Sequence, residues 1–224
     1  MIFLIDAFTG SDPENISMTV RLLLLLTVLS LAPSILILMT SFTRIIIVLS
    51  FVRTSLATQQ MPPNQLLIGL ALFMTFFIMA PTFSEINEQA LQPLFAEEIT
   101  LEEAYDNAST PLKEFMAKHT REKDLQLFMD YGNMDRPETI QDIPLSALIP
   151  AFAISEMKTA FQMGFMIFIP FLIIDMAVAS VLMSMGMMML PPVMISLPFK
   201  ILLFVLVDGW YLITHSLLDG FLPL

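Results

Sequence analysis

Four long apolar stretches, each interrupted by proline or by a charged residue, constrain the fold of this chain most strongly. The first runs from Leu22 to Thr43, and its 22 residues would form a helix about 33 Å long, enough to cross a bilayer. The others cover Leu66–Phe83, Thr159–Leu190 and Val193–Leu218. The sequence therefore predicts an all-α, membrane-associated protein whose four long kinked apolar segments form helical hairpins.

Composition narrows the possible functions further. Only 14% of the residues are charged, against about a quarter in soluble domains. There is no cysteine, and His119 and His215 lie far apart in the sequence, so we expect no metal site. No catalytic motif such as HExxH, GxSxG or a phosphate-binding glycine loop occurs, and we expect neither an enzyme nor a cofactor. The net charge of −11 argues against nucleic acid as a partner.

Acidic residues are concentrated in one stretch. Between Glu85 and Asp142 lie fourteen of the 21 acidic residues and only five of the ten Lys and Arg residues. This contrast predicts an N-terminal segment with a first apolar helical pair in 1–84 and an acidic helical extracytoplasmic insertion in 85–144. A second apolar helical pair, which includes a methionine-rich turn, occupies 145–224.

Local signals predict short helices in the insertion. Thr100 and Glu103 fit a capping box, in which each side chain satisfies a backbone N–H at the helix start. Ser109 with Pro111 predicts a second helix start, and Gly132 predicts a helix end. One apolar stripe is expected to face the rest of the protein: Leu112, Phe115, Met116, Leu127 and Phe128.

Basic residues near segment ends predict the orientation. Arg44 and Arg53 lie between the first two apolar segments, which makes them the topology-setting residues and this connection cytoplasmic. The acidic insertion and both termini are then expected outside the cytoplasm. Residues 1–17 show no clear basic region, short apolar core or small-residue cleavage site, the three features of a secretory signal.

Charged residues inside or beside apolar segments are unusual. Asp175 lies within the third segment, Lys200 and Asp208 lie eight residues apart in the fourth, and Glu156 and Lys158 precede the third. A charge at the centre of a membrane helix costs about 2.5–3.5 kcal/mol, so such groups face protein or water. The spacing of eight places Lys200 and Asp208 near one helix face. We predict an ion-pair network between helices or subunits; side chains that reach the membrane surface and a proton relay are the alternatives.

Prolines and methionines mark irregular places in the segments. Pro33, Pro170 and Pro198 each remove a helical hydrogen bond and predict kinks. Between Met183 and Pro192 five methionines occur in seven residues, next to Gly186. Methionine usually fills gaps in a core, but its flexible side chain also suits a deformable surface. This turn is therefore a candidate constriction of a pore.

Five stretches carry a further signal when they are taken together: Thr43–Ile45, Arg53–Gln65, Pro150–Phe165, Met187–Pro192 and Pro198–Trp210. In this order along the chain they resemble the FliP family of flagellar type III export proteins. The resemblance extends from about Ser11 to Trp210, and Met157 departs from it where the family usually has Leu or Ile. Many family members carry a cleavable signal peptide and this chain shows none, so its N-terminus either inserts uncleaved or was already processed.

The resemblance implies a core pore-forming subunit of the flagellar export gate in the bacterial inner (cytoplasmic) membrane, at the flagellar basal body. It implies a pentameric ring of this chain with FliR-like and FliQ-like subunits, through which unfolded flagellar proteins pass. Injectisome counterparts share the same pattern. Two sets of positions carry implied roles: a pore gasket at Met187, Met188 and Met189, and charges buried between subunits at Glu156, Asp175 and Lys200.

Two functions of other classes stay open from the residues alone. One is a secondary ion or solute transporter in which Asp175 is the coupling carboxylate, because interrupted helices also occur in transporters. The other is a passive scaffold of a membrane complex. The methionine-rich turn favours the conduit.

Overall fold

Every regular element that the computed structural model describes is helical, as predicted. It describes residues 23, 26–27, 30, 34–35, 37–58, 60–187 and 189–222. Pro33, most of the first apolar stretch and residues 1–17 lie outside the described residues. Residues 38–224 form one compact unit, and the helices below belong to it.

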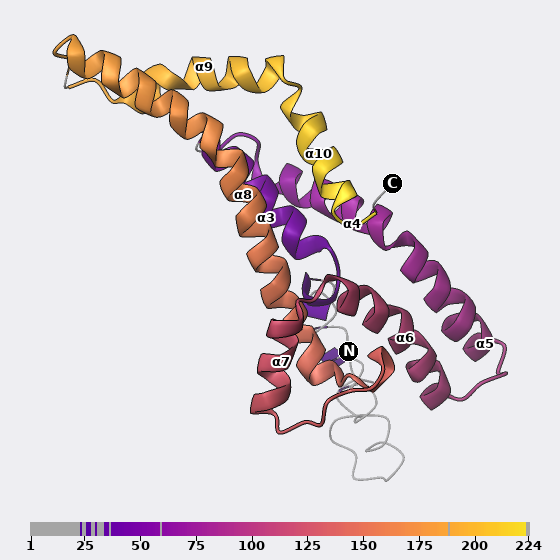
Figure 1. Ribbon diagram of the computed structural model, residues 1–224. Helices are drawn as coiled ribbons and strands as arrows, with labels where there is room; N and C mark the ends of the chain where they lie inside the picture. The colour runs from indigo at the N-terminus through magenta and orange to yellow at the C-terminus, as the bar shows by residue number, and fades with distance from the viewer. Residues whose placement is uncertain are drawn as a thin grey trace, which may run out of the picture. The chain divides into compact units, whose positions relative to one another are not determined.

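A buried helix lies at the centre of this unit. Helix α3, Phe42–Ser55, begins within the connection that was expected to carry the topology-setting arginines. Its inward residues Ile45, Val48, Leu49 and Val52 are fully buried, because α8 and α4 pack against it (Figure 1). The β-branched and leucine side chains at this helical spacing form an apolar stripe that only other helices can cover.

The second apolar segment is longer than predicted. Helix α4, Asn64–Ile86, continues through Pro81, where we expected it to end. A five-residue π-helical turn, η1, Asn87–Leu91, joins it to α5, Gln92–Phe95.

The acidic stretch forms two helices that pack against the start of α8. Helix α6, Leu101–His119, begins with the predicted capping box of Thr100 and Glu103, which is confirmed. The helix start expected at Ser109–Pro111 is wrong, because α6 runs through Pro111.

A second helix, α7, Glu122–Tyr131, follows α6 and ends at Gly132 as predicted. A 3-10 turn, η2, Ile140–Asp142, then leads to α8.

The apolar stripe of these helices was only partly predicted. Met116 is fully buried in a cluster with Phe152, and Phe115 and Leu112 pack against that cluster. On α7, however, the exposed Leu127 is not part of it; Leu125 and Met129 face inward instead. The stripe on α7 is therefore displaced from the predicted one.

One helix connects the two ends of the unit. Helix α8, Leu145–Ser184, is 40 residues long and passes through Pro150 and Pro170. It begins well before Thr159, where the third segment was expected to start. Its first turns pack against α6 and α3, and Leu148 and Phe152 are buried there. The helix thus joins the polar region around α6 and α7 to the methionine-rich turn (Figure 1).

The fourth segment is two helices. Helix α9, Pro192–Leu206, continues through Pro198, and α10, Gly209–Asp219, follows at an angle of 61°. The segment breaks at Asp208, whose φ of 51° is in the left-handed region, and not at Pro198, where only a kink was predicted. Lys200 and Asp208 do not share one helix face as predicted, because they belong to different elements.

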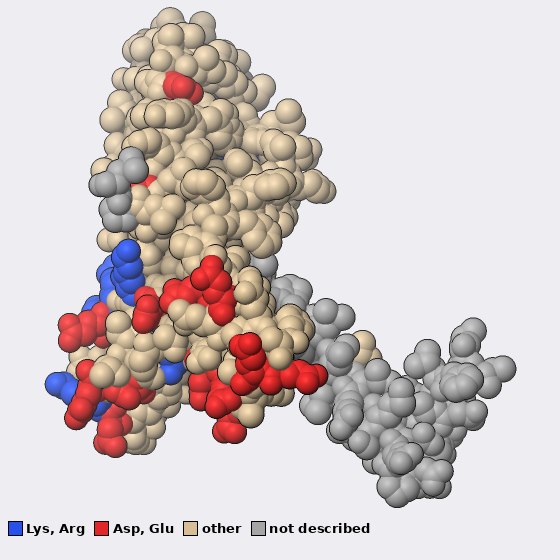
Figure 2. Space-filling model, turned by 90° about the vertical axis from the view of Figure 1, so that its right-hand side faces the viewer, with Lys and Arg blue, Asp and Glu red and all other residues tan. Residues whose placement is uncertain are grey.

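Two helical runs in the described residues, Asn64–Phe95 and Leu145–Ser184, are long and apolar enough to cross a membrane. The bent pair of α9 and α10 would be a third. Four such segments were predicted, and the described part of the chain contains two or three of them. Figure 2 shows Asp, Glu, Lys and Arg side chains gathered towards one end, while the other end is almost entirely uncharged.

Candidate functional site

Helix α8 carries two groups of charged side chains and ends at the methionine-rich turn. We call the group near its start the base cluster; it comprises Arg44, Arg121, Asp124, Ser155 and Glu156. We call the second group the arm pair; it comprises Asp175, Lys200 and Ser196. The methionine turn is residues 183–190.

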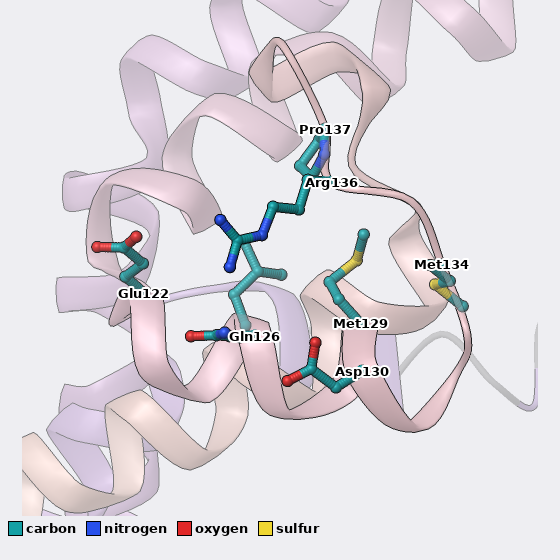
Figure 3. A pocket seen from close by; sticks show the side chains of 8 residues that line it. Glu122, Gln126, Met129, Asp130, Met134, Arg136 and Pro137 are labelled. Carbon is teal, nitrogen blue, oxygen red and sulfur yellow. The ribbon is translucent and has the colours of Figure 1, made fainter.

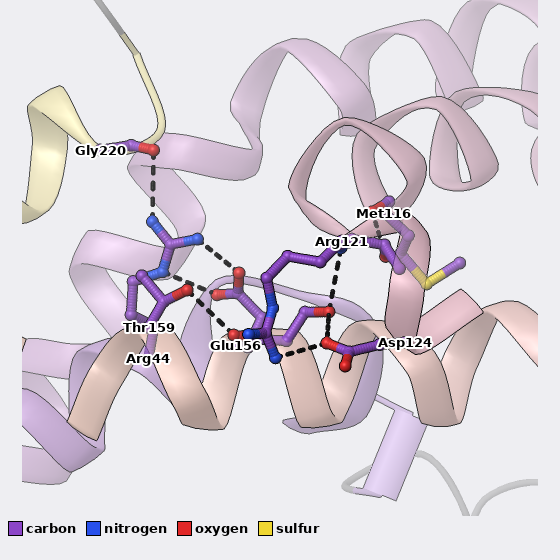
Figure 4. A network of polar contacts seen from close by, with 9 residues as sticks. Arg44, Met116, Arg121, Asp124, Glu156, Thr159 and Gly220 are labelled. Carbon is purple, nitrogen blue, oxygen red and sulfur yellow. Dashed lines mark hydrogen bonds and ion pairs between the residues drawn. The ribbon is translucent and has the colours of Figure 1, made fainter. Parts of the chain in front are cut away.

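The base cluster is built around a buried ion pair between α3 and α8. Arg44 Nε donates a hydrogen bond of 2.9 Å to Glu156 Oε2, and Arg44 Nη2 bonds Glu156 Oε1 (Figure 4). Glu156 is 0% exposed. The pairing is bidentate, the geometry in which a guanidinium and a carboxylate satisfy each other most fully. Glu156, predicted to join helices or subunits, thus joins two helices of one chain.

The same arginine holds the C-terminal end of α10. Arg44 Nη1 donates to the carbonyl oxygen of Gly220 at 3.2 Å, and Arg44 Cζ lies 3.8 Å from the centre of the Phe221 ring. Phe221 also contacts the rings of Phe115 and His119. A cation over an aromatic face is favourable, and more so when both are buried. No pattern in the sequence singles out Phe221, because it lies after the last apolar segment.

A second contact joins α7 to α8. Ser155 Oγ donates to Asp124 Oδ2 at 2.6 Å and accepts from the backbone N–H of Arg121 at 3.0 Å. Arg121 also forms an ion pair with Asp124. Burial raises the pKa of Asp124, but the hydrogen bonds from Ser155 and Arg121 outweigh it and lower that pKa below its ordinary value. Asp124 is therefore ionised, and sequence reasoning did not select it.

His119 borders the base cluster at the end of α6. Burial, together with the positive charges of Arg44 and Lys118, lowers the pKa of His119 to about 4. The imidazole is therefore neutral at physiological pH. This neutral ring packs against the edge of Phe221 without adding a charge beside Arg44.

The arm pair connects α8 with α9. Lys200 Nζ lies 2.6 Å from Asp175 Oδ2 and donates to the carbonyl oxygen of Ser55 at 3.2 Å. Ser196 Oγ donates to Asp175 Oδ1 at 2.5 Å. Lys200 is 2% exposed and Asp175 23%. The structure thus brings together two of the predicted charges, whereas Asp208 is not part of the pair.

The two arginines expected to set the topology lie on α3. Arg44 is buried in the ion pair described above. Arg53, in the last turn of α3, donates to Asn64 Oδ1 and to the carbonyl oxygen of Pro62 at 3.5 Å. It therefore fixes the connection that leads into α4.

The methionine turn places sulfur-containing side chains on the surface. Gly186 adopts a φ of 75°, which closes the turn after α8. Met187 is 45% exposed and Met189 98%. Met188, the third predicted gasket residue, lies outside the described residues. Met183 and Met185 are also more than half exposed, so the described methionines of the turn do not form a core.

A cavity of about 210 Å³ lies between α7 and the segment that follows it (Figure 3). Leu125, Met129 and Met134 form its apolar wall, and Glu122, Asp130 and Arg136 line its charged side. No residue predicted for the site lines it. The described residues contain no group of three or more His, Asp or Glu side chains placed to hold a metal ion.

Comparison with known proteins identifies similar chains over almost the whole length. The model of the FliP family matches residues 25–217. The chain is 77% identical over 217 residues to a protein of Bacillus subtilis strain 168 named flagellar biosynthetic protein FliP, covering 97% of this chain and 98% of that protein. Proteins of the same name from Borreliella burgdorferi and Caulobacter vibrioides are 51% and 54% identical. The alignments cover 97% and 90% of this chain and 85% and 76% of those proteins.

Proposed function

Because the chain belongs to the FliP family of flagellar biosynthesis proteins, and so to the flagellar export apparatus, we propose that it is a core pore-forming subunit of the export gate. Unfolded flagellar proteins would pass through the conduit that it forms with its partners. The chain would act by assembly and steric gating rather than by catalysis.

The methionine turn is the observation that carries this proposal. Its exposed thioether side chains, with Met189 almost fully accessible, stand at the free end of the hairpin formed by α8 and α9. Unbranched methionine side chains repack around different contents at low cost. A ring of such turns would close around an empty pore and yield to a passing chain.

Assembly would cover the apolar surface that the chain leaves open. Only 11% of the most apolar stretch of α8 is buried within the chain, whereas 39% of the most apolar stretch of Asn64–Phe95 is buried. Exposed apolar patches of this extent mark contacts with lipid or with other proteins. We propose a pentameric ring of this chain with FliR-like and FliQ-like subunits in the bacterial inner membrane, at the flagellar basal body.

The arm pair counts against the transporter alternative. A coupling carboxylate must take up and release a cation or proton during each cycle. Asp175 already pairs with the ammonium group of Lys200 and accepts from Ser196. A structural role in holding α9 against α8 accounts for both contacts.

The gating proposal is tested by the ion conductance of the assembled complex in planar bilayers. Replacing Met187, Met188 and Met189 together by Ala is expected to raise the leak of the closed complex. The control replaces Met166 and Met176, exposed methionines of α8 outside the turn, and is expected to leave the leak unchanged. An unchanged leak in the triple variant would rule out the gasket.

We also propose that α6 and α7 face the extracytoplasmic side. The chain has no cysteine, so Tyr131→Cys on α7 introduces one exposed thiol. In whole cells this thiol is expected to react with a membrane-impermeant maleimide. Met61→Cys, exposed between α3 and α4, should react only after the cells are opened, and the reverse pattern would contradict the orientation.

A further inference from the structure

Charged residues are few in the C-terminal part of the chain, and most of them are paired. Glu156 pairs with Arg44, Asp175 with Lys200, and Asp219 with His215. Lys158 and Asp208 form no ion pair or side-chain hydrogen bond with any described residue. Residues 145–222 contain six Asp, Glu, Lys and Arg residues: Glu156, Lys158, Asp175, Lys200, Asp208 and Asp219.

Lys158 stands on an apolar face of α8. Its side chain is exposed. Lys158 contributes least among the groups that lower the pKa of Asp124, whose carboxylate is already bonded to Ser155 and Arg121. Residues three or four positions apart share one face of a helix. The exposed residues on this face of α8 include Ile154, Phe161 and Phe165, together with the uncharged polar Gln162.

Asp208 stands alone in a second apolar surface. It lies at the break between α9 and α10, its side chain is exposed, and its carboxylate does not cap α10. The left-handed backbone that holds it there is unusual for a residue with a side chain. Its exposed neighbours are Val205, Leu206, Val207, Tyr211 and Leu212.

The two unpaired charges cannot neutralise each other within one chain. Arg44 bonds both Glu156 and Gly220, so the part of α8 around Lys158 lies beside the end of α10. Asp208 precedes the start of α10. The 11 residues of α10 separate these levels by about 16 Å, farther than a lysine side chain extends.

We propose that Lys158 of one copy pairs with Asp208 of the next copy and brings their two apolar surfaces together. This contact rests on the proposed function, since it joins copies of the chain within the conduit. Both surfaces are apolar, each contains one unpaired charge, and the charges are opposite. A charge left unpaired among apolar side chains is costly, and a complementary charge on the partner removes that cost.

The arrangement on the chain points to a second copy rather than a different subunit. The two halves of the contact are separated along the same molecule by the length of α10, so each copy can offer one half to each neighbour. Such a head-to-tail contact repeats around a ring until it closes. For such a contact to repeat, each copy must carry both an unpaired positive and an unpaired negative charge, as Lys158 and Asp208 provide.

The contact is tested first by exchanging the charges, with oligomers counted by native mass spectrometry of the detergent-extracted complex. Lys158→Glu alone and Asp208→Lys alone are each expected to lower the recovered oligomer about tenfold or more, because like charges then face each other. The variant with both changes is expected to recover it. Lys123→Glu, exposed on α7, is the matched control and should assemble normally.

Disulfide formation tests the same contact without relying on charge. Chains with Lys158→Cys and chains with Asp208→Cys are produced together with the partner subunits, and mild oxidation is expected to link one chain of each kind. Because the natural chain has no cysteine, every linked dimer reports this pair. Chains with Lys123→Cys replace the first partner as the control and should not link.

The outcomes separate this contact from the wider proposal. Normal assembly of both single charge variants together with no disulfide would overturn the Lys158–Asp208 contact, while the conductance of the methionine variants would still decide the gasket. A disulfide from Asp208→Cys to a cysteine placed on another kind of subunit, and not to Lys158→Cys, would also overturn it.

Discussion

The two ends of α8 contain similar residues in different surroundings. At the base cluster, Glu156 is fully buried, its charge is paired, and rings from α6 and the C-terminal end cover the pair. The arm is the part of α8 around Asp175 together with α9. Its residues near Asp175 are exposed or half-buried except for Phe171, and one ion pair between Asp175 and Lys200 holds α9 against α8. The base is thus satisfied by the chain itself, whereas the arm leaves its apolar surface to lipid or to other chains.

This difference separates folding from assembly. A change at the base removes contacts that exist in the single chain, so it acts on the free energy of unfolding. A change on the arm surface acts mainly on contacts that form between molecules. The following substitutions test that division.

The largest effect is expected at the buried ion pair. Glu156→Gln leaves the guanidinium of Arg44 buried without a counter-charge, which should cost about 3–5 kcal/mol of the free energy of unfolding. Denaturant titration of the purified chain in detergent measures it. Replacing Arg44 and Glu156 together by Met should recover most of that loss. A single-variant loss no larger than that of an arm-surface change would contradict the comparison.

A smaller loss is expected at the arm pair. Asp175→Asn leaves Lys200 buried, but the Ser55 carbonyl remains as an acceptor, so we expect about 2–3 kcal/mol. Lys200→Met should cost less, because Asp175 is partly exposed and keeps its bond from Ser196. Unfolding of both variants under the same conditions gives the order. If Lys200→Met were the more damaging change, the assigned burial of the two groups would be wrong.

The free energy of unfolding should also depend on pH through His119, which borders the base cluster. Its pKa is about 4 in the folded chain and about 6.5 when unfolded, so only the unfolded state takes up the proton between these values. The free energy of unfolding therefore has its full value above about pH 6.5. It declines as the pH falls towards 4, by about 1–2 kcal/mol for this partly exposed group.

Unfolding measured at pH 7.5 and at pH 5 tests this dependence. His119→Gln should remove much of the difference between the two pH values. His215→Gln, on the exposed side of α10, should keep it. A difference of equal size in both variants would assign the effect to other groups.

The smallest effect on the single chain is expected from the arm surface. Leu206→Ala removes an exposed side chain of α9 and should change the unfolding free energy by less than about 0.5 kcal/mol. The matched change Leu49→Ala, at a fully buried position of α3, should cost about 2–5 kcal/mol. Recovery of the oligomer should fall for Leu206→Ala. Equal losses of stability in both variants would show that the arm is already covered.

Local features of the sequence were predicted well. The helical class follows from the length of the apolar stretches, and the capping box at Thr100 and the end of α7 at Gly132 follow from neighbouring side chains. Such features depend on residues within one or two turns, so the sequence contains all that is needed.

The places where helices start and break were predicted only in part. Proline removes a helical hydrogen bond, yet α6 continues through Pro111, where a helix start was predicted, and α9 continues through Pro198. The break in the fourth segment falls instead at Asp208, where no proline stands. Whether a weak point becomes a break depends on what packs against it.

Composition and the length of the apolar stretches are enough to predict a helical, apolar protein whose few charges in those stretches need partners, because a bare charge there is too costly. The identity of those partners emerges from the packed helices. Arg44 and Glu156 are 112 residues apart in the chain, and Asp175 and Lys200 are 25 apart. Pairing over such distances is set by how whole helices pack, which no local pattern records.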